Sequence, residues 1–266
     1  MKVFMSADIE GITTTTMWDE TISTNALYPK HAKQMTDEVL ACIQGVKKAG
    51  AKEIVVKDAH DTGMNIDPVR MPSGVTLRRK WTGHPYCMAD GVDKTFDAAL
   101  FVGYHSAAGR PGNPMSHTLT GRLAYIKLNG SLASEFMLFS YACALEGVPT
   151  VFLSGDKMLC DDSKDLHPGL ITCAVKEGIG ELTVNYSPED TVKNITNLSE
   201  NALKQDLKKA LVKLPEHFSV EICYKEHSRA EKASWYPGVK RESANVITFE
   251  SNDYFEILRT INWVAF

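Results

Sequence analysis

The chain begins with Met1-Lys2-Val3-Phe4-Met5-Ser6-Ala7-Asp8-Ile9-Glu10-Gly11. The apolar run at residues 3–5, closed off within a few residues by Gly11, is typical of a buried strand. Asp8 and Glu10 follow it two positions apart, and in an extended chain this spacing places both side chains on one side of the backbone. Two buried carboxylates need a positive group beside them. The stretch therefore indicates a divalent metal site, with a helix cap or a solvent-facing pair as the simpler alternative.

Three further apolar runs predict strands of the same sheet, at residues 54–56, 98–102 and 150–153. Between the first two strands, Pro29 opens a helix whose apolar side chains recur at helical spacing as far as Gly50. Such a strand–helix–strand unit makes its two strands parallel. The pattern predicts an α/β fold in which a mostly parallel sheet lies between two helical layers.

From about residue 169 the alternation of buried strands and helices gives way to a less regular pattern. The elements expected there are a strand at residues 170–175, a helix from Ser187 to about Leu214, a strand at residues 219–223, a short helix near Arg229, a strand at residues 246–249 and a helix from about Asp253. We expect a larger catalytic α/β domain over residues 1–176 and a smaller α+β domain over residues 177–266.

Composition and charge restrict the class of protein. Of 266 residues, 44% are hydrophobic and 23% are charged, which is enough to bury a large core. The net charge of −4 and the lack of a Lys/Arg-rich stripe argue against a nucleic-acid or anionic-membrane partner. Six cysteines without a CxxC pair, no signal-peptide pattern and no apolar run long enough to span a bilayer lead us to expect a soluble cytoplasmic protein.

Chemically active side chains follow three of the predicted strands. Asp8 and Glu10 follow the first strand, His60 the second and His105 the third. Open parallel sheets bind ligands at the carboxyl ends of their strands, so we expect these four side chains in one cleft. Carboxylates together with imidazoles suit zinc, and an aspartate can bridge two ions. A single histidine after a strand is more often structural, so the metal hypothesis depends on all four.

Other candidates have equally simple structural explanations. Glu135 starts a predicted helix, where an acid is favoured in any case. Asp58 lies two positions before His60 and is either its hydrogen-bond acceptor or a surface residue. His117 follows a segment dense in glycine and proline, residues 109–114, which forms either a mobile lid that positions His117 or an ordered surface turn.

Taken together, five short motifs resemble the zinc-dependent D-aminopeptidases of the dipeptide-operon type. They are Ser6-Ala7-Asp8-Ile9-Glu10-Gly11-Ile12, Asp58-Ala59-His60, Gly103-Tyr104-His105, Met115-Ser116-His117-Thr118 and the helix start at Glu135. Their order and spacing match the family across residues 1–155. The chain departs from the usual pattern at Lys57, where the family has asparagine, and at Ser134, where it has glycine.

This resemblance implies a centre with two zinc ions. Asp8 would bridge the ions, Glu10 and His105 would hold one of them, and His60 and Glu135 the other. His117 matches the catalytic histidine of the family. The resemblance also implies a homo-oligomeric ring whose active sites face an inner chamber, with a decamer as the candidate size.

The implied activity is that of a metallo-aminopeptidase that removes the N-terminal residue, D-alanine for example, from short peptides. One alternative is a di-metal amidase or phosphohydrolase acting on another small molecule. A phosphate site would need an arginine, for which Arg110 and Arg122 are the nearby candidates. A second alternative is a metal-binding ring protein without activity, but such a protein would have no need of His117.

Overall fold

The computed structural model describes residues 1–266 and contains the predicted parallel sheet. In spatial order its seven strands are β3 (Val75–Arg78), β2 (Glu53–Asp58), β1 (Lys2–Ala7), β4 (Ala98–Tyr104), β7 (Thr150–Asp156), β8 (Ile171–Ile179) and β9 (Leu182–Asn185). All neighbours pair in parallel except β8 and β9, which form an antiparallel hairpin at one edge. β1, the first stretch of the chain, therefore lies inside the sheet.

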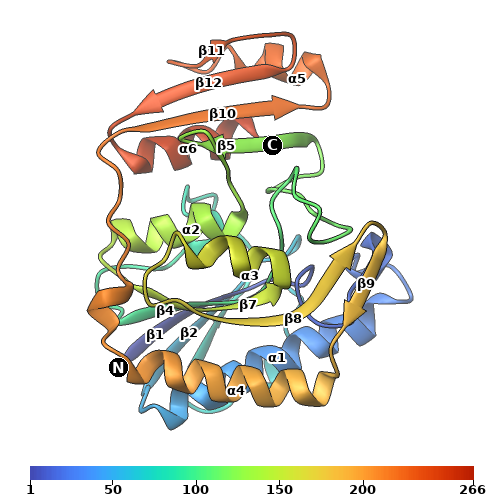
Figure 1. The fold of residues 1–266 in the computed structure, drawn as a ribbon, viewed down its shortest axis with the longest axis vertical. Coiled ribbons are helices and arrows are strands. Elements are labelled where there is room, and N and C mark those ends of the chain that lie inside the picture. The colour runs from blue at the N-terminus through green and yellow to red at the C-terminus, as the bar shows by residue number, and fades with distance from the viewer.

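Helices cover both faces of this sheet. Figure 1 shows α1 (Tyr28–Lys48) and α4 (Pro188–Lys204) on one face and α2 (Glu135–Leu145) and α3 (Lys157–Lys164) on the other. α1 has Pro29 in its first turn and buries an apolar side chain set at helical spacing: Met35, Val39, Cys42, Ile43 and Val46. α1 and α4 approach closely at Gly45, where an added Cβ would lie 2.1 Å from Ser199 Oγ. These layers confirm the predicted α/β class.

A second, antiparallel sheet lies beyond α2 (Figure 1). Its strands in spatial order are β11 (Lys240–Arg241), β12 (Val246–Ser251), β10 (Phe218–Tyr224), β5 (Leu123–Leu128) and β6 (Ser131–Leu132). Alternate residues of β10 are buried, as expected for a sheet with one covered face. That face packs against α6 (Tyr254–Val264), and α5 (His227–Ala233) lies beside β10 and β12.

The predicted boundary after residue 176 falls inside β8, and both sheets draw on segments from either side of it. β5 and β6 pair with β10, whereas α4 packs on α1 under the first sheet. The division into two domains stays a prediction. The predicted extent of the helix after Ser187 is wrong, because α4 ends at Lys204. Asp206 then caps a separate 3₁₀ turn, η4 (Leu207–Ala210), by accepting a hydrogen bond from the Lys208 N–H.

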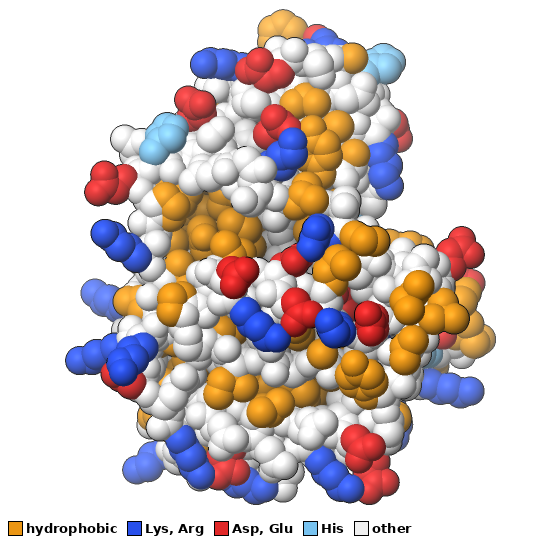
Figure 2. All heavy atoms as spheres, in the orientation of Figure 1, with side chains coloured by type: hydrophobic (Ala, Val, Ile, Leu, Met, Phe, Trp, Pro, Cys, Tyr) orange, Lys and Arg blue, Asp and Glu red, His pale blue; other side chains and the backbone are white.

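The surface mixes charges of both signs. The face drawn in Figure 2 carries acidic and basic side chains close together, with hydrophobic side chains between them. None of the helices combines the length and the apolar character that a membrane span requires.

The sheet register brings the candidate residues to one edge. Ala7, the last residue of β1, lies opposite Asp58 of β2 and Val102 of β4. Strands β1, β2 and β4 therefore end side by side, and the residues that follow them meet beyond the carboxyl ends of the strands.

Candidate metal centre and active site

The backbone after β1 continues along β4, and this fixes Asp8 and Glu10. The Asp8 N–H donates to Val102 O at 2.9 Å, and the Gly11 N–H donates to Gly103 O at 2.8 Å. At Gly11 an added Cβ would lie 1.7 Å from Tyr104 O, so only glycine fits this approach. Asp8 and Glu10 are both 2% exposed.

His60 and His105 lie on opposite sides of the Asp8 carboxylate. His60 Nδ1 is 3.5 Å from Asp8 Oδ1 and 2.9 Å from Glu10 Oε2. His105 Nε2 is 3.4 Å from Asp8 Oδ2 and 3.3 Å from Glu135 Oε2. Each oxygen of Asp8 therefore faces a different histidine, which is the arrangement that a bridging carboxylate needs.

The second nitrogen of each histidine is occupied by a backbone carbonyl. His60 Nε2 lies 3.1 Å from Thr21 O, and His105 Nδ1 lies 3.0 Å from Ser106 O. With the protons on these nitrogens, His60 Nδ1 and His105 Nε2 keep free lone pairs that face the carboxylates. Metal-binding histidines are commonly oriented in this way.

Asp58 fits neither predicted alternative, because it accepts no hydrogen bond from the His60 ring and it is fully buried. Its carboxylate accepts instead from the backbone N–H groups of Asn65 and Ile66 and from Asn65 Nδ2. Asn65 Nδ2 also donates to His60 O at 2.7 Å. Asp58 thus stabilises the turn that carries His60, and Thr21 orients the ring.

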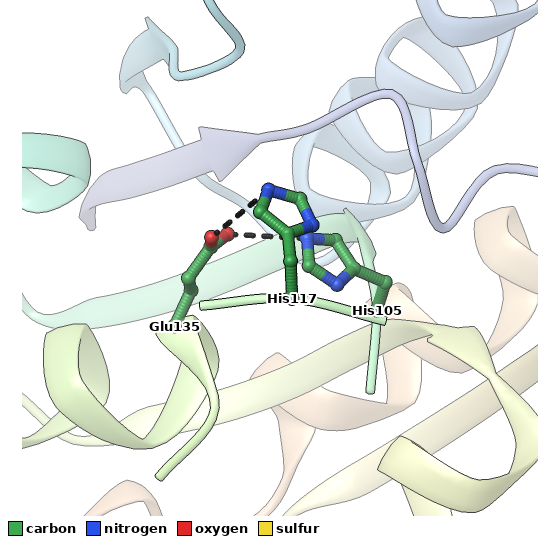
Figure 3. A group of neighbouring side chains, drawn as sticks. All are labelled: His105, His117 and Glu135. Atoms are coloured by element: carbon green, nitrogen blue, oxygen red, sulfur yellow. Dashed lines mark ion pairs between the residues drawn. The ribbon is translucent and has the colours of Figure 1, made fainter. Parts of the chain in front are cut away.

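Glu135 and His117 complete the cluster (Figure 3). Ser134 caps α2 by accepting a hydrogen bond from the Met137 N–H at 3.1 Å, which places Glu135 in the first turn of the helix. Glu135 Oε1 accepts from the Leu119 N–H at 2.6 Å and lies 3.6 Å from His117 Nε2.

His117 is held on three sides. Its ring is parallel to that of His105, with 4.4 Å between the centroids, and the Trp18 ring contacts it edge-on at 5.0 Å. His117 Nδ1 lies 2.9 Å from Met115 O. With a proton on Nδ1, the lone pair of Nε2 faces the cluster.

Three buried ligand atoms in the cluster have no hydrogen-bond partner: Asp8 Oδ2, Glu10 Oε2 and His105 Nε2. His60 Nδ1 lies 2.9 Å from Glu10 Oε2, but with the ring proton on Nε2 it has no hydrogen to donate. Unpartnered buried polar atoms are costly, and a cation would satisfy all three. Ligand atoms of Asp8, Glu10 and His105 lie within 4.8 Å of one another, as do those of His105, His117 and Glu135. This donor set of carboxylates and imidazoles fits zinc.

Burial and the charges of neighbouring groups shift the pKa values of the cluster residues. Burial raises the pKa of Asp8 well above its usual value, and the Glu10 carboxylate raises it further. Burial would lower the pKa of His105, but Glu135 and Asp8 outweigh it and raise this pKa to about 10. Burial and the nearby His105 lower the pKa of His117. His117 is therefore the cluster's histidine best suited to be neutral near pH 7.

A cavity of about 640 Å³ opens in front of the cluster. Aromatic side chains of Trp18, Trp81 and Phe266 line it, together with the carboxylates of Asp61 and Asp90. No lysine or arginine is among its lining residues. The candidate phosphate-binding arginines are absent from the lining, and Arg110 pairs with Asp162 instead, through contacts of 2.8 and 2.6 Å.

Several cavity residues were not predicted from the sequence. Trp18 lies on a short 3₁₀ turn, η1 (Trp18–Glu20), and His84 lies in the segment rich in glycine and proline before η3 (Cys87–Ala89). Neither residue belongs to a periodic pattern that would predict its position at the cavity.

Lys57 could have been singled out from the sequence, because the family has asparagine at this position. It is buried, donates to the carbonyls of Asp58 and Lys80, and places Nζ 3.8 Å from the centroid of Trp81.

The segment before His117 forms a packed turn at Gly112 and Asn113, and its movement as a lid stays a prediction. Asn113 is 3% exposed, and its Nδ2 donates to Glu10 O at 2.9 Å. The Gly112 carbonyl accepts from the Gly178 N–H at 3.0 Å, and a Cβ at Gly112 would lie 2.3 Å from Met158 Cβ. Gly112 and Asn113 are therefore held by β8, by α3 and by the backbone that follows β1.

Comparison with known proteins identifies relatives of the whole chain. The sequence matches the family model for D-aminopeptidase over residues 1–263. It is 28% identical over 260 residues to a D-aminopeptidase of Bacillus subtilis (strain 168), covering 96% of this chain and 93% of that protein. The structure is similar to that of the Zn-dependent D-aminopeptidase DppA from Bacillus subtilis, a self-compartmentalizing protease, with a TM-score of 0.93 and 26% identity over 100% of this chain and 97% of the other. The chain belongs to the D-aminopeptidase family.

Proposed function

We propose that this aminopeptidase removes the N-terminal residue from short peptides, with D-alanine as a candidate residue, at a centre that binds two zinc ions. The observation that carries the proposal is the position of Asp8 between His60 and His105, with one carboxylate oxygen toward each. The Zn-dependence of the similar DppA supports zinc as the metal.

In this proposal Asp8 would be shared by both ions, Glu10 and His105 would hold one of them, and His60 and Glu135 would hold the other. Ligand atoms of Asp8, Glu10 and His105 lie within 4.8 Å of one another, which supports the first group. The second group requires His60 and Glu135 to share an ion, whereas His60 Nδ1 lies 2.9 Å from Glu10 and Glu135 lies 3.3 Å from His105 Nε2. Bound zinc supplies a Lewis acid that polarises the peptide carbonyl and lowers the pKa of water.

His117 transfers the proton. With its Nδ1–H donating to Met115 O, its Nε2 accepts a proton from the attacking water and returns it to the leaving amine. Stacking on His105 and contact with Trp18 keep the ring in this orientation. The aromatic walls of the cavity hold the peptide and restrict the entry of water.

The charge of the cavity favours a peptide with a free amine over a phosphate ester. Asp61 and Asp90 line the cavity outside the ligand set, without a lysine or arginine among the lining residues; of the two, Asp90 already pairs with Arg78, at 3.6 Å. Negative side chains attract an α-ammonium group and repel a phosphate dianion. The phosphohydrolase alternative therefore lacks an arginine that would bind a phosphate beside the metal ions.

We also propose a homo-oligomeric ring. The description of DppA as a self-compartmentalizing protease supports it, and the structural match covers this whole chain. Trp235 and Trp263 are 79% and 69% exposed, respectively, and are candidates for burial between subunits.

The rate on short peptides should depend on a free N-terminus. We expect an N-acetylated alanyl peptide to be cleaved at least about 100-fold more slowly than the free peptide, because acetylation removes the cationic group that the acidic cavity favours. Initial rates with D- and L-alanyl peptides and with an aryl phosphate, measured on the zinc-loaded enzyme, provide the test. Equal cleavage of the acetylated peptide would indicate a broader amidase, and hydrolysis of the phosphate alone a phosphohydrolase.

A further inference from the structure

The polar run Thr13-Thr14-Thr15-Thr16 has no role in the proposed chemistry, yet each residue contacts the β8–β9 hairpin or the residue after it. The contacts are Thr13 Oγ1 to Tyr186 O at 2.7 Å, Thr14 N to Asn185 Oδ1 at 2.9 Å, Thr15 O to Lys176 Nζ at 2.5 Å and Thr16 Oγ1 to Thr183 Oγ1 at 2.6 Å. This threonine run is therefore held along its whole length by the edge of the first sheet.

Lys176 lies at the centre of these contacts. It is fully buried in β8, and its Nζ donates to Thr15 O and to Glu10 O. Its hydrogen-bond partners are these two backbone carbonyls, and a buried ammonium group is costly without such partners. Lys176 therefore links the backbone of Glu10, a proposed metal ligand, to the backbone of the threonine run.

The same carbonyl of Glu10 receives a second donor from the segment that leads to His117. Asn113 Nδ2 donates to Glu10 O at 2.9 Å. This segment is itself fastened to the hairpin, because the Gly178 N–H donates to Gly112 O at 3.0 Å, and a Cβ at Gly178 would lie only 2.5 Å from that oxygen. The end of β8 therefore contacts both chain segments that carry active-site residues.

The loop beyond the threonine run carries two further contacts to the active site. Trp18 packs edge-on against His117, and the carbonyl of Thr21 is the partner of His60 Nε2. The Glu20 carboxylate stiffens the turn between them by accepting from the N–H groups of Thr16 and Met17. A displacement of the threonine run would thus disturb the contacts that hold Glu10, His60 and His117 in position.

We propose that Lys176 is a positioning residue of the active site, through which the β8–β9 hairpin fixes Glu10 as a metal ligand and holds the loop of residues 11–21 against His60 and His117. This inference rests on the proposed function, because it assigns the hairpin a role toward the metal centre.

The test is Lys176→Met in the full-length enzyme, which keeps most of the length of the side chain and removes its donors. We expect zinc affinity, measured by competition with a chelator, to fall about 10–100-fold, as it does when partners of metal ligands are lost. Amide hydrogen exchange should become faster over residues 11–21. Two controls should leave both measurements unchanged: Lys193→Met, which removes an exposed lysine of α4, and Ile222→Ala, which destabilises the buried face of β10.

Wild-type zinc affinity and wild-type exchange over residues 11–21 in Lys176→Met would overturn the inference, as would an equal loss of zinc affinity in Ile222→Ala. If Lys176→Met does not fold, the exposed Asn185→Ala variant decides, since it removes the acceptor of the Thr14 N–H and the donor to Thr183 Oγ1, both on the hairpin side of the threonine run. Faster exchange around Thr14 and a lower kcat with zinc retained would support the inference, and neither change would refute it. A wild-type enzyme without zinc would refute the proposed function instead, and the exchange measurement would still decide whether the hairpin holds the loop.

Discussion

Replacing Asp8 with alanine should abolish peptide hydrolysis and leave at most one zinc ion per chain. The reason is that Asp8 directs one oxygen toward His60 and the other toward His105, so both proposed ions share it. The loss of activity should exceed the roughly 10–100-fold that follows the loss of a residue outside the ligand set. Elemental analysis and initial rates on the same preparation measure both effects.

Asp61→Ala is the matched control for this variant. Asp61 is also an acid that lines the cavity, but it is exposed and outside the ligand set. This control should keep both zinc ions. Two zinc ions retained in Asp8→Ala would show that the bridging role belongs to another residue.

His117→Ala should have the opposite signature, with both zinc ions retained and turnover reduced about 100- to 10,000-fold. This is the range expected when a general acid–base group is lost. The substitution removes Nε2, the atom that we assign to proton transfer, but none of the five proposed ligands. Zinc content and kcat distinguish the two effects, and His84→Ala provides a control histidine from the same cavity.

Loss of zinc in His117→Ala would contradict this role. His117, His105 and Glu135 also bring ligand atoms within 4.8 Å of one another. A variant that lost one ion along with turnover would therefore identify His117 as a ligand, and the proton transfer would have to be assigned to a different group.

The part of the site that could be predicted from the sequence alone follows from strand geometry. Asp8, Glu10, His60 and His105 each come directly after a strand of one parallel sheet, and the observed register brings those strand ends together. Glu135 and His117 had equally good structural explanations as a helix start and a loop histidine. Only the resemblance of the combined motifs to a known family separated them from those explanations.

The remaining features depend on contacts between segments far apart in the chain. Lys176 donates to a carbonyl 166 positions away, and Trp18 contacts His117 although the two residues are far apart in the chain. The predicted end of α4 lies too far along the chain, because the apolar pattern continues past Lys204 while Asp206 caps a new turn. Neither side-chain capping nor tertiary hydrogen bonds leave a periodic trace in the sequence.

Zinc content per chain is the most direct test of the proposed centre. Purified protein that has been incubated with zinc and then freed of unbound metal should contain about two equivalents per chain by elemental analysis, and it should hydrolyse alanyl peptides. Protein that remains without zinc after reconstitution, or that cleaves these peptides at the same rate once zinc has been removed, would contradict the two-zinc mechanism.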